Sequence, residues 1–211
     1  MENEKLRQEI IETAIAFNET GLSVGTSGNL SARTDRGYLI TPRNFVYQDL
    51  KPDGLIEMDL QGKQLSGRHT PSSEWHFHQE IFRARSEINA IVHVHSPYAT
   101  GIACIRQNIP AFHYMIAIAG GDNIRCADYA TFGTEALAKN VVKALVDRDA
   151  CLLANHGVIT LGKTVTYAFK LAQEVENLAK QYWISQQIGD PVILDDAEMK
   201  IILEKFKTYR K

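Results

Sequence analysis

Two histidines separated by a single residue, His93 and His95, stand within residues 90–96. The β-branched residues around them are typical of a strand, in which alternate side chains project from the same face. Two imidazoles on one face of a rigid element can bind a single transition-metal ion. The alternative is that both histidines are hydrogen-bonded members of a half-buried strand. Further candidate ligands must therefore decide between the two interpretations.

His156 and Glu74 could complete such a metal site. His156 interrupts an apolar run at residues 150–159, which favours a buried strand, and packing rarely calls for a histidine there. Three imidazoles and an exchangeable oxygen ligand from Glu74 are typical of catalytic zinc, with Co²⁺ or Mn²⁺ as substitutes. Such a metal acts as a Lewis acid on a carbonyl or hydroxyl oxygen and stabilises an enediolate. Glu74 could then serve as the base that takes a proton from carbon.

Two segments have the composition of anion-binding loops. Residues 24–33 are rich in glycine, serine and threonine, and precede a strand-like segment at 38–41. Backbone N–H groups of such a loop can approach an oxyanion closely, although a tight hairpin connection explains the composition equally well. Ser72 and Ser73 open a helix that we expect to run to about Arg85, with Glu74 in its first turn. A helix N-terminus attracts phosphate, but ordinary capping also explains the serines. Metal, base and anion sites together suggest chemistry on a phosphorylated hydroxy-ketone.

The remaining pattern predicts alternating helices and strands around these residues. Apolar residues at helical spacing mark helices near 6–17, after Ser96, over 137–145, over 164–187 and after Asp195. Two short strands joined by a glycine-containing turn fit residues 49–67, and residues 126–133 look poor in strand. No internal repeat or linker interrupts the chain. We therefore expect one α/β domain over residues 1–211.

Composition narrows the class of protein. The chain has 211 residues, 45% apolar and 23% charged, with a net charge of −2 and no basic stripe that would indicate nucleic-acid binding. No segment resembles a secretory signal or a membrane span, so we expect a cytoplasmic protein that binds neither membranes nor nucleic acid. Three widely spaced cysteines predict reduced thiols rather than a disulfide framework.

An ordered set of motifs resembles the class II aldolase/epimerase family, from the first helix to the tail. Any one of these motifs is weak, but the set in this order is specific. The motifs are Gly25-Thr26-Ser27-Gly28-Asn29, Pro71-Ser72-Ser73-Glu74, His93-Val94-His95, His113-Tyr114-Met115-Ile116-Ala117, Tyr129-Ala130-Thr131-Phe132-Gly133, Asn155-His156-Gly157 and Glu204-Lys205-Phe206-Lys207-Thr208-Tyr209.

The resemblance implies a fold and a role for each matching residue. The fold would be a mainly antiparallel central sheet flanked by helices, assembled as a homotetramer with active sites between subunits. His93, His95 and His156 would bind zinc, with Glu74 as a displaceable ligand and acid/base. Tyr114 would protonate the aldehyde oxygen from across a subunit boundary. The residues expected to hold the substrate phosphate are Thr26, Gly28, Asn29, Arg43, Asn44, Ser72 and Ser73.

The resemblance also implies an aldehyde pocket and shows one departure from the family pattern. Phe132 and Tyr209 match residues that surround the aldehyde half of the substrate. Arg43-Asn44 stands where similar family members carry Thr-Gly, and the added cation would tighten phosphate binding or change which sugar phosphate is accepted.

Several activities fit the resemblance. The first is zinc-dependent retro-aldol cleavage of L-fuculose 1-phosphate to dihydroxyacetone phosphate and L-lactaldehyde. Cleavage of 5-deoxyribulose or methylthioribulose 1-phosphate would differ only in the aldehyde pocket. A 4-epimerase of ribulose 5-phosphate is a further alternative, although residues 114–121 resemble the aldolase form. A non-catalytic metal-binding scaffold would be expected to lose Glu74 or the hydroxyl-rich loop at residues 24–33, and both are retained.

Overall fold

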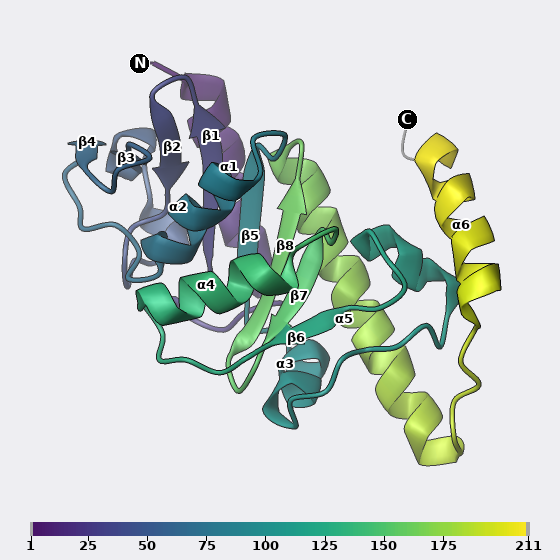
Figure 1. Ribbon diagram of the computed structural model, residues 1–211. Coiled ribbons are helices and arrows are strands. Elements are labelled where there is room, and N and C mark those ends of the chain that lie inside the picture. Colours follow the sequence, from purple (N-terminus) through teal and green to yellow (C-terminus); the bar gives the residue numbers. More distant parts are fainter. Residues whose placement is uncertain (1, 210–211) are drawn as a thin grey trace.

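The computed structural model describes residues 2–209, with the side chain of Tyr209 excepted, and shows a central sheet between two layers of helices (Figure 1). Within the described residues the sheet has eight strands in the order β4-β3-β2-β1-β5-β8-β7-β6. Neighbouring strands are antiparallel except for the pair β6 and β7 at one edge. The expected single-domain α/β fold with a mainly antiparallel sheet is confirmed.

The strands have three to six residues each, and the α-helices are longer. The strands are β1 Asn29–Thr34, β2 Gly37–Ile40, β3 Ile56–Met58, β4 Gln64–Ser66, β5 Ala90–Val94, β6 Arg125–Ala127, β7 Ala150–Leu153 and β8 Gly157–Gly162. The α-helices are α1 Glu4–Glu19, α2 Trp75–Ala84, α3 Pro97–Cys104, α4 Glu135–Ala144, α5 Val165–Ile188 and α6 Asp196–Tyr209. The described residues also form the 3₁₀ helices η1 Tyr47–Asp49, η2 Pro52–Gly54 and η3 Tyr114–Ala119.

Alternation along the strands divides the interior into two apolar layers. In β5, Val92 and Val94 face a layer that includes α1, α3 and α5, whereas Ile91 faces the layer under α2 and α4. Figure 1 shows α2 and α4 on one side of the sheet and α1 and α5 on the other. His93 shares the α2 side with Ile91, because the two residues are separated by one pleat. The fold thus directs His93 toward the start of α2.

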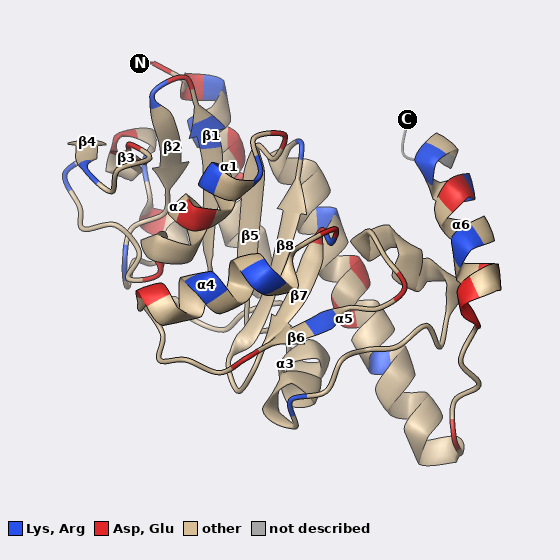
Figure 2. Cartoon of the chain, in the orientation of Figure 1, with Lys and Arg blue, Asp and Glu red and all other residues tan. Residues whose placement is uncertain are grey.

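Charged side chains are confined largely to the helices and loops (Figure 2). The central strands β5, β7 and β8 contain no Lys, Arg, Asp or Glu. This is the pattern expected of strands whose two faces are both covered by helices. Among the described helices, none combines the length and apolar character needed to cross a bilayer.

Three expectations about local structure are wrong. Residues 150–159 form two strands, β7 and β8, rather than one, because the chain turns at Asn155, whose φ is 53°. The region 126–133 is poor in strand as expected, since β6 ends at Ala127. Residues 24–33 are not all loop, because β1 begins at Asn29. Helix α2 begins at Trp75, so Glu74 occupies the N-cap position before the first turn.

Candidate metal and substrate site

The ends of three neighbouring strands bring the candidate metal ligands together. His93 lies in β5, His95 follows the last residue of that strand, and His156 lies in the turn between β7 and β8. Because β8 lies between β5 and β7 in the sheet, this turn is close to the end of β5. Glu74 approaches from the start of α2, which covers the same face. Residues far apart in sequence therefore meet at one end of the neighbouring strands β5, β8 and β7.

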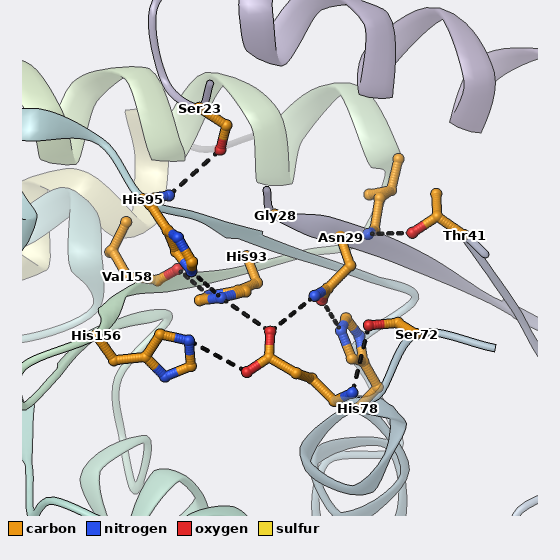
Figure 3. Close-up of polar contacts among 12 residues, drawn as sticks. Ser23, Gly28, Asn29, Thr41, Ser72, His78, His93, His95, His156 and Val158 are labelled. Atoms are coloured by element: carbon orange, nitrogen blue, oxygen red, sulfur yellow. Dashed lines mark hydrogen bonds and ion pairs between the residues drawn. The ribbon is translucent and has the colours of Figure 1, made fainter. Parts of the chain in front are cut away.

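The four side chains form a group that could hold a metal ion. Figure 3 shows the three histidine rings turned toward one another. One ligand atom from each of Glu74, His93, His95 and His156 lies within 4.8 Å of the others. Glu74 Oε2 is 3.1 Å from His93 Nε2, and Glu74 Oε1 is 3.2 Å from His156 Nε2. No other group within the described residues has this composition of histidine, cysteine and acidic side chains.

Hydrogen bonding leaves the inward nitrogen of His93 free to bind a metal. His93 is fully buried, and its Nδ1 donates to the Val158 carbonyl oxygen at 3.0 Å. A neutral ring bonded in this way has no proton on Nε2, which lies 3.0 Å from Nε2 of His95. Oε1 of Glu74 is buried and accepts no well-aligned hydrogen bond despite its distance from His156. Bare nitrogens and an unsatisfied carboxylate oxygen fit a divalent metal such as zinc.

Electrostatics keeps the cluster in the protonation state that metal binding requires. Burial would raise the pKa of Glu74, but its interactions with the His93 and His156 rings outweigh this effect and lower that pKa. Burial lowers the pKa of His95 to about 3, and the neighbouring rings of His93 and His156 act in the same direction. Near neutral pH, Glu74 is therefore an anion and His95 is a neutral imidazole.

A cavity of about 350 Å³ adjoins the candidate ligands. It is large enough for a small sugar phosphate. All the residues predicted to hold phosphate line it, together with Phe132 from the predicted aldehyde pocket. The lining residues are Thr26, Ser27, Gly28, Asn29, Pro42, Arg43, Asn44, Ser72, Ser73, Glu74, His95, Tyr129, Ala130, Phe132, Asn155 and His156.

Two predicted site residues lie elsewhere or cannot be placed. Tyr114, at the start of η3, is 52% exposed and does not line the cavity of its own chain. The side chain of Tyr209 lies outside the described residues. Asn29 does line the cavity, but its amide already contacts Glu74 and His78, which leaves only its remaining N–H groups for a ligand.

Four residues near the site had no predicted role. Tyr129 and Asn155 line the cavity, and Arg106 joins them by donating from Nε to Asn155 Oδ1 at 2.8 Å and covering the Tyr129 ring. His78 lies fully buried behind Asn29. The position of His78 four residues after Glu74 is a sequence signal that could have found it, because residues at that spacing share one helix face.

Gly157 is the residue that lets the β7–β8 turn approach the histidines. A Cβ at this position would lie 2.6 Å from the Val94 carbonyl oxygen and 2.8 Å from Cδ2 of His95. We expect Gly157→Ala to destabilise the protein by about 1–3 kcal/mol and to weaken zinc binding, because the two strands must move apart. The control Gly101→Ala meets no atom within 4 Å and should be neutral or stabilising. Urea unfolding and zinc titration of both variants provide the measurement, and equal behaviour would contradict the expectation.

The buried His78 should make stability depend on pH. Burial lowers its pKa to about 3 from an ordinary value of 6.5, so the unfolded chain binds the proton first as pH falls. The free energy of unfolding contributed by this group therefore decreases below about pH 6.5, by about 2 kcal/mol between pH 7 and pH 5. Urea unfolding of the metal-free protein at both pH values, compared with His78→Gln, measures this contribution. The same pH dependence in both proteins would rule it out.

Comparisons with known proteins show the family to which the chain belongs. The family described as "Class II Aldolase and Adducin N-terminal domain" matches residues 8–183, and the chain belongs to it. It is a class II aldolase, a metal-dependent lyase, as the resemblance implied.

Individual relatives carry two kinds of name. A 5-methylthioribulose-1-phosphate/5-deoxyribulose-1-phosphate aldolase from Rhodospirillum rubrum is 48% identical over 97% of this chain and 92% of the relative. An L-fuculose phosphate aldolase from Escherichia coli K12 is 45% identical over 99% of this chain and 97% of the relative. A solved structure named L-fuculose 1-phosphate aldolase superposes with a TM-score of 0.95 at 42% identity, covering 98% of each chain.

Proposed function

We propose that this protein cleaves a ketose 1-phosphate, with L-fuculose 1-phosphate as the first candidate, to dihydroxyacetone phosphate and a short aldehyde. The observation that carries the proposal is the placement of Glu74. This one carboxylate contacts the histidine cluster and lines the cavity that the hydroxyl-rich loop and the two serines also line. An acid/base group, a metal site and an anion site therefore adjoin one another.

Zinc is the proposed metal, held by His93, His95 and His156 with Glu74 as the displaceable ligand. Three neutral imidazoles and one exchangeable position suit catalytic zinc, and Co²⁺ or Mn²⁺ would be substitutes. When bound, the metal would polarise the substrate carbonyl group and stabilise negative charge on the neighbouring oxygens.

The substrate phosphate would be held by the hydroxyl-rich loop, Arg43 and the serines before α2. Gly28 has a φ of +85°, and a Cβ there would lie 2.8 Å from the His93 carbonyl oxygen, so only glycine keeps this backbone against β5. Exposed Arg43 adds a cation that can bind two phosphate oxygens at once. The loop thus fixes one end of the substrate relative to Glu74.

The reaction then requires two proton transfers. The C4 hydroxyl group loses its proton, the C3–C4 bond breaks, and C4 leaves as the aldehyde carbonyl. The electron pair of that bond remains on C3, and Glu74, which would take up a proton once substrate displaces it from the histidine cluster, delivers that proton to C3 to complete dihydroxyacetone phosphate. The proton lost from the C4 hydroxyl group balances the one added to C3, so no proton is gained or lost over the cycle. We assign the exchange of the first proton to Tyr114 of a neighbouring copy, since Tyr114 is exposed and outside its own chain's cavity. A homotetramer with sites between subunits would supply it.

A second substrate class is favoured by the Rhodospirillum rubrum relative and by a 5-deoxy-D-ribulose 1-phosphate aldolase from Bacillus thuringiensis that is 40% identical over 98% of this chain. These compounds share the dihydroxyacetone phosphate half and differ in the aldehyde. The same Glu74 and metal would act on them, while residues such as Phe132 and Tyr129 would select the aldehyde.

A coupled assay of dihydroxyacetone phosphate release tests the proposal. Zinc-loaded protein is offered L-fuculose 1-phosphate, 5-deoxyribulose 1-phosphate and methylthioribulose 1-phosphate at equal concentrations. We expect release from at least one, with L-fuculose 1-phosphate giving the highest kcat/KM. A higher value for either alternative would reassign the substrate, and release from none by zinc-loaded protein would overturn the cleavage proposal.

A further inference from the structure

We propose that His78 is a positioning residue that orients the Asn29 amide and, through it, fixes one oxygen of Glu74. This inference rests on the proposed function in taking Glu74 as the acid/base. It assigns a role in the reaction to a buried histidine outside the metal cluster. It also identifies which carboxylate oxygen of Glu74 is left to exchange a proton with substrate.

The fold brings the members of this network together from two elements. Glu74 and His78 lie four residues apart, one at the N-cap of α2 and the other on the next turn of the same face. Asn29 and Ser31 alternate along β1 and therefore share the face that α2 covers. In the register of β1 with β5, Asn29 stands opposite His93. His78 thus reaches between these two polar residues of the strand, and Figure 3 shows its contact with Asn29.

Both nitrogens of the His78 ring are occupied. Nδ1 is 2.6 Å from Ser31 Oγ, and Nε2 is 2.5 Å from Asn29 Oδ1. The other atom of the Asn29 amide, Nδ2, donates to Glu74 Oε2 at 2.9 Å. A carboxylate can only accept hydrogen bonds, so the amide nitrogen must face Glu74 and the amide oxygen must face His78.

These constraints determine where the protons lie. Because Asn29 Oδ1 accepts, a neutral His78 must carry its proton on Nε2, and Nδ1 must accept from the Ser31 hydroxyl group. Each group then donates toward Glu74, from Ser31 to His78 to Asn29 to Oε2. If His78 carried its proton on Nδ1, the amide of Asn29 would be free to flip and present its oxygen to the carboxylate. His78 with its proton on Nε2 therefore stabilises the orientation in which Asn29 Nδ2 donates to Oε2.

Burial makes this chain of hydrogen bonds costly to rearrange. Ser31 and His78 are fully buried, and Asn29 is 4% exposed. Water cannot readily replace a lost partner there, and an unsatisfied buried polar group is unfavourable. The network consequently holds Oε2 in place. Oε1 accepts no well-aligned hydrogen bond, so we assign the proton exchange with substrate to Oε1.

Two substitutions of the same chemical type separate this role from simple packing. The amide nitrogen of Gln can occupy the position of Nε2, whereas Asn reaches only the position of Nδ1. We expect His78→Gln to keep kcat within about 3-fold of the original protein. His78→Asn and His78→Ala should lower kcat about 10–100-fold. Loss of a group that supports a metal ligand through hydrogen bonds commonly has an effect of this size. KM and zinc stoichiometry should change little, since the glycine- and serine-rich loop before β1, the serines before α2 and the three histidines are unchanged.

The control for lost packing is Ile81→Ala, a buried residue of α2 outside the network. It should destabilise the fold without the selective loss of kcat. Equal kcat values for His78→Gln and His78→Asn would overturn the positioning role, whether both were high or both were low. Unchanged activity of folded His78→Ala would also overturn it.

A second measurement does not depend on activity or on any variant. Long-range ¹H–¹⁵N correlation spectra of the metal-free protein report which ring nitrogen of His78 is protonated. We expect a proton on Nε2 at pH 7, and a proton on Nδ1 would contradict the network. A protein that cleaves none of the sugar phosphates but shows the Nε2 tautomer would refute the proposed function while leaving the network intact.

Discussion

Glu74→Gln is expected to reduce cleavage by at least about 10³-fold while leaving the protein folded. The amide keeps the size of the side chain and can still meet Asn29, but it can neither carry the negative charge of the cluster nor exchange a proton with carbon. General acid–base groups commonly contribute 10²–10⁴-fold, and loss of a fourth ligand adds to this effect. The measurement is kcat with the substrate that the coupled assay selects, together with bound zinc.

A matched control for this variant is Glu57→Gln. Glu57 is also a buried acid, 3% exposed in β3, but it contacts Thr34, Ser66 and Arg36 rather than the histidine cluster. It should retain activity even if it costs some stability. Retention of activity in zinc-loaded Glu74→Gln would remove Glu74 from the chemistry.

Loss of the metal is the second large effect that we expect. Chelation should reduce cleavage to background, and added zinc should restore it, with Co²⁺ and Mn²⁺ restoring part of it. His93→Ala should weaken zinc binding by more than about 100-fold, because it removes a buried ligand whose orientation the Val158 carbonyl group fixes. Isothermal titration with zinc and metal analysis after gel filtration measure both effects.

The comparison for His93→Ala is His76→Ala. His76 lies in the same part of the structure, stacked on Trp75, but within the described part of the chain it belongs to no group that could hold a metal. Its substitution should leave zinc binding unchanged. Full activity of the chelated protein, or equal zinc affinity of the two variants, would show that the histidine cluster is not the metal site.

The metal candidates could be predicted from sequence because strand geometry constrains them strongly. A His-x-His pair on a strand must place both rings on one face, wherever that strand lies in the fold. His156 was found through its contrast with an apolar surrounding. The sharp turn beside it was not, because a buried hairpin and a single long buried strand have the same apolar composition. The chain turns between β7 and β8 because Asn155 adopts the left-handed conformation.

Strand β1 was not predicted from sequence because its residues that face the site are polar. Residues of β1 that face the apolar layer under α1 are Leu30 and Ala32, but those on the other face are Asn29 and Ser31. Polar side chains placed for the network made this strand look like the continuation of a glycine-rich loop. Hydrogen-bond networks between distant segments leave no periodic signal, so the connection from His78 to Glu74 through Asn29 of β1 appeared only in three dimensions.

Exchange of hydrogen in dihydroxyacetone phosphate tests the central claim, that Glu74 beside a metal moves a proton on carbon. The protein is incubated with this product in D₂O without any aldehyde, so the result does not depend on which sugar phosphate is natural. We predict that the zinc-loaded protein incorporates deuterium at the hydroxymethyl carbon, and that chelated protein and zinc-loaded Glu74→Gln do not. No incorporation by the zinc-loaded protein, or undiminished incorporation by Glu74→Gln, would contradict the account.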